Sequence, residues 1–178
     1  MIIKMLTETD AYLFGFFALI IVEAVMFIRK TELKRKVMIG LFVVYITLAL
    51  SVTLFPIPFQ ETYLSGYGYN FIPFKSIADS LNAGLRPTLT SVLGNVILTI
   101  PFGFLITLLK GNKKFLNVLL WIVSFSLAIE LAQFVIGVGI GYRYRNVDID
   151  DLILNTTGGI TGYAIYKITP RKILNIFE

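Results

Sequence analysis

The sequence predicts an all-α, polytopic membrane protein with about five transmembrane helices and a short amphipathic helix on the outer surface. Of its 178 residues, 56% are hydrophobic and only 15% are charged, whereas soluble domains have about 25% charged residues. The apolar residues are also grouped into long runs, and a bilayer core requires about 20 consecutive apolar residues per helix. One transmembrane domain over residues 1–178 is therefore expected.

Five runs are candidates for spans, and they cover residues 11–28, 37–55, 88–109, 115–136 and 152–169. Glu23 is the only charge in the first run, and Glu130 is the only charge in the fourth. The fifth run is polar, so it needs protein neighbours rather than lipid around it. Its Gly158-x-x-x-Gly162 spacing allows close helix approach, which we interpret as internal packing rather than a dimer face.

The segment from Pro56 to Pro87 is predicted to lie outside the membrane. Its first half is rich in Tyr, Gly and Pro, and its second half has apolar residues at helical spacing. Pro73 is typical of a helix start and Gly84 of a helix end. We expect a surface helix between them, with nearby aromatic residues either in an interfacial belt or in contact with a ligand.

The distribution of basic residues predicts the orientation of the chain. With five spans, eleven of the sixteen Lys and Arg residues fall on the side of the C-terminus and five on the other. Basic loops usually stay in the cytoplasm, so the N-terminus is expected outside and the C-terminus inside. Nucleic-acid binding is excluded because no basic surface remains after these loops are assigned. No oligomeric state is predicted.

The chain has no cysteine and no histidine. Disulfides, thiol chemistry, Ser-His or Cys-His dyads and His-ligated zinc are therefore excluded. No cofactor is expected, and the alternative is a divalent cation held by carboxylates.

Polar residues in the predicted spans fall in the outer half of the membrane. Helical rise places Asn95 and Glu130 roughly 10 Å below the outer surface. The loop 141–151 lies above them and carries Arg143, Arg145 and three aspartates. A buried ionised group needs a partner, and the candidates for Glu130 are Gln133, Asn95, Asn155 and Arg145. These residues form either an outward-opening polar pocket or hydrogen bonds that hold the helices together.

The run Asp148-Ile149-Asp150-Asp151 has three interpretations. An aspartate can cap the helix that follows it. The aspartates can instead pair with Arg143 and Arg145. Two carboxylates could also hold Ca²⁺ or Mg²⁺, although the spacing is not that of an EF-hand loop.

Several short motifs together are similar to the VanZ-like family. They are Asn70-Phe71-Ile72-Pro73-Phe74, Gly94-Asn95 with Pro101-Phe102-Gly103-Phe104, Glu130-x-x-Gln133, and Arg145-x-x-Asp148-x-Asp150-Asp151 before Asn155-x-x-Gly158. The resemblance covers about residues 70–163. It implies a bacterial plasma-membrane protein, and founding members of the family are associated with low-level resistance to the glycopeptide teicoplanin.

These observations lead to two alternative hypotheses for the function. In the first, the polar pocket binds a membrane lipid, a lipid-linked cell-wall precursor or a lipophilic glycopeptide. In the alternative, the protein is an intramembrane enzyme that acts on a lipid or lipid-linked sugar, with Glu130 as acid or base. The binding hypothesis is preferred, with ligand-binding candidates Asn70, Asn95, Glu130, Gln133, Arg143, Arg145, Asp148, Asp150, Asp151 and Asn155. Asp148, Asp150 and Asp151 are the metal candidates.

Overall fold

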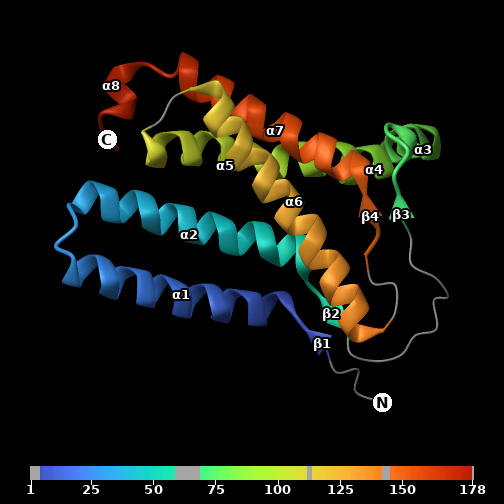
Figure 1. Cartoon of the computed structure of the whole chain (residues 1–178), viewed down its shortest axis with the longest axis horizontal. Helices are drawn as coiled ribbons and strands as arrows, with labels where there is room; N and C mark the ends of the chain where they lie inside the picture. The colour runs from blue at the N-terminus through green and yellow to red at the C-terminus, as the bar shows by residue number, and fades with distance from the viewer. Residues whose placement is uncertain (1–4, 59–68, 112–113, 142–144, 178) are drawn as a thin grey trace.

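The computed structural model describes residues 5–58, 69–111, 114–141 and 145–177. These residues form a bundle of long helices with four two-residue strands at one end (Figure 1). The first two helices, α1 (Glu8–Ile28) and α2 (Leu33–Leu54), form an antiparallel hairpin. The later long helices are α5 (Gly94–Lys110), α6 (Phe115–Ile140) and α7 (Ile149–Ile168). The prediction of an all-α polytopic membrane protein is confirmed.

The third span is longer at its N-terminal end than the sequence predicted. A short helix, α4 (Leu85–Pro87), and a π-helical stretch, η1 (Thr88–Leu93), continue directly into α5. Together they make one helix of 26 residues, Leu85–Lys110. This helix, α1, α2 and α6 are the four helices of the described residues that are long and apolar enough to cross a membrane.

The predicted fifth span corresponds to α7, which is not among those four candidates. Its 20 residues would extend about 30 Å, the thickness of a hydrocarbon core. α7 packs closely along α5 (Figure 1), so protein replaces lipid on that face. The prediction that α7 is a fifth span is therefore supported by its length and its position beside α5, and not by its hydropathy.

Small residues allow α5 and α7 to approach each other. A Cβ atom on Gly158 would collide with the carbonyl oxygen of Val96, and one on Gly162 would collide with that of Ile100. Gly158 and Gly162 are both buried against α5. The prediction that the Gly-x-x-x-Gly pair serves internal packing is confirmed.

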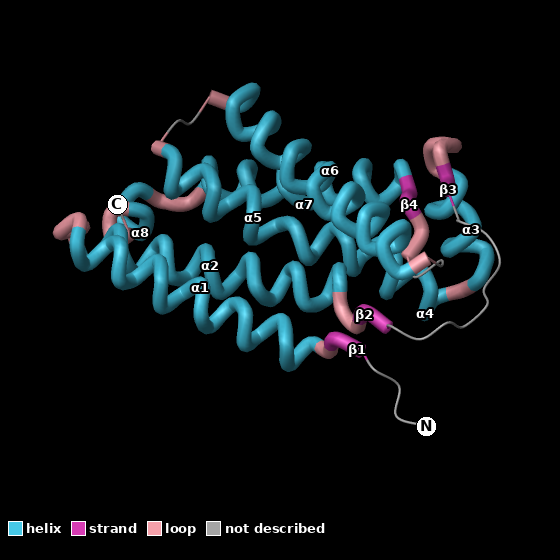
Figure 2. The backbone as a smooth tube through the Cα atoms, turned by 60° about the horizontal axis from the view of Figure 1, so that its bottom comes forward, coloured by secondary structure: helices cyan, strands magenta, loops and turns pink. Residues whose placement is uncertain are grey.

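Apolar packing joins α5 to α6 further along the bundle. Phe102 of α5 stacks on Phe125 of α6, with 4.1 Å between the ring centroids. Ile106, Val118 and Ile122 complete this buried cluster. This contact fixes α6 where it crosses the bundle obliquely (Figure 1), while α1 packs mainly on α2 at the edge of the bundle (Figure 2).

The two ends of the bundle differ. One end carries the α1–α2 turn, the α5–α6 turn and the C-terminal helix α8 (Arg171–Leu174) (Figure 1). Lys34 Nζ donates a hydrogen bond to the Asn175 carbonyl oxygen at this end, at 2.8 Å. The predicted basic loops therefore gather at one end, although the membrane orientation itself stays a prediction.

The opposite end holds the short strands and the surface helix. Strand β1 (Met5–Leu6) pairs antiparallel with β2 (Ile57–Pro58), and β3 (Tyr69–Asn70) pairs parallel with β4 (Val147–Asp148). The predicted amphipathic helix is present as α3 (Lys75–Ala83). It ends at Gly84, whose φ of 112° favours glycine. The strand pairings were not predicted, and the tyrosine-rich stretch 59–68 lies outside the described residues.

Candidate functional site

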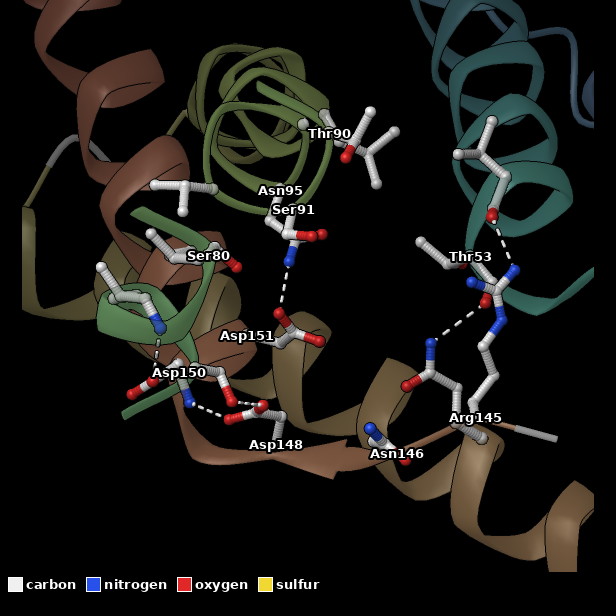
Figure 3. A pocket seen from close by; sticks show the side chains of 18 residues that line it. Thr53, Ser80, Thr90, Ser91, Asn95, Arg145, Asn146, Asp148, Asp150 and Asp151 are labelled. Carbon is white, nitrogen blue, oxygen red and sulfur yellow. Dashed lines mark hydrogen bonds between the residues drawn. The ribbon is translucent and has the colours of Figure 1, made fainter. Parts of the chain in front are cut away.

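A half-open polar cavity of about 850 Å³ lies at the end of the bundle that carries α3. Its walls come from α2, α3, η1, α5, α6, α7 and the residues before β4 (Figure 3). The polar and charged residues that line it are Thr53, Ser76, Ser80, Thr90, Ser91, Asn95, Gln133, Arg145, Asn146, Asp148, Asp150 and Asp151. Six of the ten predicted ligand-binding residues are among them.

Asp148 connects β3, α3 and α7. It is the N-cap residue of α7, and its Oδ1 accepts a hydrogen bond from the Asp150 backbone N–H at 2.9 Å. The same carboxylate accepts hydrogen bonds from Asn70 Nδ2, at 2.8 Å, and from the Ser76 hydroxyl. The capping interpretation of the aspartate run is therefore confirmed for Asp148. Asn70 lies behind this carboxylate rather than in the cavity wall.

Asp150 binds the start of α3 from a distance of more than 70 residues in sequence. Its Oδ1 accepts from the Phe74 N–H at 2.5 Å, and its Oδ2 accepts from the Ile77 N–H at 3.2 Å. Its side chain is only 1% exposed. The first amides of a helix have no partner within the helix, so Asp150 caps α3 from outside and fixes it over the cavity.

Asp151 and Asn95 form a contact between α7 and α5. Asn95 Nδ2 donates to Asp151 Oδ1 at 2.5 Å. Figure 3 shows Asp151 between Asn95 and the Asp148–Asp150 pair, on the wall of the cavity. The structure thus pairs Asn95, predicted within the third span, with Asp151, predicted in the loop above it.

The partner of Glu130 differs from the four candidates named from the sequence. Its Oε2 accepts a hydrogen bond from the backbone N–H of Asp148 at 3.1 Å. Glu130 is 6% exposed and is not among the residues that line the cavity. A carboxylate on α6 therefore anchors the chain where β4 leads into α7.

Gln133 and Arg145 both attach to the end of α2. Gln133 Nε2 donates to the Thr53 carbonyl oxygen at 3.0 Å. Arg145 Nη2 donates to the carbonyl oxygens of Val52 and Phe55 at 3.3 and 3.2 Å. The last carbonyls of a helix have no partner within the helix, so Arg145 stabilises the C-terminus of α2 at the rim of the cavity.

The remaining predicted residues do not line the cavity. Asn155 is 3% exposed, and its Oδ1 accepts no hydrogen bond from the described residues. Arg143 lies outside the described residues.

The structure does not gather the metal candidates around one point. Among the described residues, no group of three acidic side chains is placed to hold a metal ion. The carboxylates of Asp148 and Asp150 are instead directed at protein donors. Their geometry is that of helix caps.

Sequence reasoning missed the hydroxyl groups of the cavity. Ser76 and Ser80 are one turn apart on α3, so they share a face, and Thr90 and Ser91 precede Asn95 by about one turn. The polar face of the predicted surface helix was the available signal. The prediction of this helix rested on its apolar face alone.

Comparison with known proteins adds a family relationship. A family model described as VanZ/LLP1 matches residues 42–170. Protein VanZ of Enterococcus faecium is 28% identical over 139 residues, which cover 75% of this chain and 76% of that protein. None of the solved structures matches the chain.

Proposed function

The chain belongs to the VanZ/LLP1 family, and from this premise we propose that it is a bacterial envelope protein with a ligand-binding cavity on the outer face of the plasma membrane. The cavity would bind the polar headgroup of a lipid, a lipid-linked cell-wall precursor or a lipophilic glycopeptide. Through such binding the protein would alter susceptibility to glycopeptides such as teicoplanin.

The observation that carries this proposal is the polar cavity at one end of an apolar bundle. Its volume of about 850 Å³ lies within the roughly 300–1,000 Å³ of typical small-ligand sites. One of its walls is the end of α2, whose outer face carries exposed apolar side chains such as Leu41, Val44 and Leu48. An amphiphile could place its headgroup in the cavity while its chains remain in the membrane.

The position of Glu130 favours binding over the enzymatic alternative. A general acid or base must come within hydrogen-bond distance of its substrate. Glu130 is buried behind the cavity wall and accepts a backbone N–H of the protein. Its contact supports a role in holding α7 in place.

Filling the cavity tests the proposal. Ser80 lines it from α3, so Ser80→Phe should exclude a headgroup while leaving the capping contacts of Asp148 and Asp150 intact. In a susceptible bacterial host that expresses the chain, we expect wild type to raise the minimal inhibitory concentration of teicoplanin and Ser80→Phe to abolish the increase.

Asn82→Phe is the matched control, because Asn82 lies on the same helix, is exposed and does not line the cavity. It should behave like wild type, with both variants quantified in the membrane fraction. A Ser80→Phe variant that accumulates normally and protects as well as wild type would show that the cavity is not the functional site.

A further inference from the structure

The wall of the cavity is richer in negative charge than in positive charge. Among the residues that the structure describes, the charged ones that line it are three aspartates, Asp148, Asp150 and Asp151, and one arginine, Arg145. A phosphate or carboxylate entering this space would meet carboxylates on α7. The charge balance favours a ligand group with a positive charge.

The donors of the wall are largely directed at the protein itself. The Arg145 guanidinium donates to carbonyl oxygens of α2, and Asn95 Nδ2 donates to Asp151. The Ser76 hydroxyl donates to Asp148, and the Thr90 hydroxyl donates to the Arg86 carbonyl oxygen at 3.0 Å. The donor atoms named here already bind acceptors of the protein, which lowers the number of donors that an anionic ligand group would meet.

One acceptor of the wall is buried and has no partner in the part of the chain that the structure describes. Gln133 lines the cavity and is 8% exposed. Its Nε2 is held by the Thr53 carbonyl oxygen, while its Oε1 accepts no hydrogen bond from the described residues. Buried acceptors are normally paired, so this oxygen indicates that a donor is supplied from elsewhere.

We propose that the group bound in this cavity is a primary ammonium carried by a membrane amphiphile. An ammonium supplies positive charge and three N–H donors. The Asp151 carboxylate, whose Oδ1 already accepts from Asn95, provides the counter-charge, and Gln133 Oε1 provides a neutral acceptor. This inference rests on the proposed function and specifies the headgroup that the cavity recognises.

Lipid retention measured by native mass spectrometry tests the inference. The purified protein is placed in nanodiscs of phosphatidylethanolamine, phosphatidylcholine or phosphatidylglycerol with identical acyl chains, and in equimolar mixtures of them. Phosphatidylcholine has the same formal charges as phosphatidylethanolamine but no N–H donors, and phosphatidylglycerol is an anion. We expect about tenfold preferential retention of phosphatidylethanolamine, the ratio that one charge-assisted hydrogen bond typically supplies.

Asp151→Asn should reduce this preference to near unity. The new amide oxygen can still accept from Asn95, so the contact between α5 and α7 is retained. Asp79→Asn is the matched control, because Asp79 is exposed on α3 and does not line the cavity. It removes the same charge from the same end of the molecule and should leave the preference unchanged. A monodisperse size-exclusion profile for each variant establishes that it is folded.

The outcomes separate this inference from the proposed function. Lipid retention that Ser80→Phe removes, but that shows no preference or favours phosphatidylglycerol, would overturn the ammonium assignment and leave a headgroup site in place. A phosphatidylethanolamine preference that survives Asp151→Asn would also overturn it. Retention unaffected by Ser80→Phe would overturn the inference, and the proposed function would then be decided by the susceptibility measurement alone.

Discussion

The aspartates at the start of α7 illustrate how single residues organise this protein. Asp148 caps its own helix, and Asp150 caps α3, which precedes it by more than 70 residues. A cap residue typically contributes about 0.5–2 kcal/mol. These two carboxylates thus join α3 to α7, and both helices line the cavity. Asp151, the third aspartate, lies on the cavity wall and contacts Asn95.

Glu130 can be tested for a structural role by two substitutions. Glu130→Gln keeps an oxygen that can accept the Asp148 N–H, so its unfolding free energy should fall less than that of Glu130→Ala. Glu130→Ala leaves that N–H buried and unpaired, which costs about 1–3 kcal/mol. Thermal unfolding in detergent micelles measures both.

The same two variants distinguish a structural role of Glu130 from a catalytic role. We expect Glu130→Gln to protect a host against teicoplanin as well as wild type does. A Glu130→Gln protein with wild-type stability and no protective effect would instead favour the acid/base hypothesis.

At the scale of elements, the contact between α5 and α7 determines whether α7 can belong to the bundle. α7 is too polar to qualify as a span by hydropathy. The backbones of the two helices approach closely at Gly103, Gly158 and Gly162, where a Cβ would collide with the carbonyl oxygen of the facing helix. Close approach of this kind provides van der Waals contact that lipid chains cannot match.

Gly158→Ala should therefore destabilise the protein. The added methyl group meets the Val96 carbonyl oxygen and the Thr99 hydroxyl, and overpacking of this kind costs about 1–3 kcal/mol. Gly139→Ala is the matched control, because Gly139 lies in α6 and a Cβ there meets nothing within 4 Å. Equal unfolding temperatures for the two variants in the same detergent would contradict the packing role of Gly158.

At the scale of the whole molecule, the polar cavity and the basic turns lie at opposite ends of the bundle. The cavity and α3 lie at one end, and the turns that the sequence marks as basic lie at the other, with α8 (Figure 1). Basic loops remain in the cytoplasm, so the cavity is expected to open on the outer face. This orientation decides which leaflet and which extracellular molecules the cavity can reach.

The absence of cysteine makes this orientation directly measurable. Single substitutions Asp79→Cys on α3 and Glu32→Cys in the α1–α2 turn place one thiol at each end. In intact cells or spheroplasts, a membrane-impermeant maleimide should label Asp79→Cys and should label Glu32→Cys only after lysis. The reverse pattern would place the cavity in the cytoplasm.

The sequence alone determined the fold class and the approximate positions of the long helices. A bilayer requires about 20 apolar residues for each crossing. These residues are consecutive in the sequence, so a long apolar run reveals each crossing. The surface helix was predictable for a similar reason, because Pro73 and Gly84 limit helices through local backbone geometry. The constant rise of a helix also placed Asn95, Glu130 and Gln133 near the same end.

Only the tertiary structure decided which of these polar groups meet. Asn70 contacts Asp148 and Asn95 contacts Asp151 across 78 and 56 residues of sequence. Sequence patterns within one helix do not identify which residues of another helix it will face. That choice depends on tertiary packing, such as the packing of Gly158 against α5. For that reason the sequence named six residues of the cavity wall, while Glu130 was found behind the wall, paired with a backbone amide.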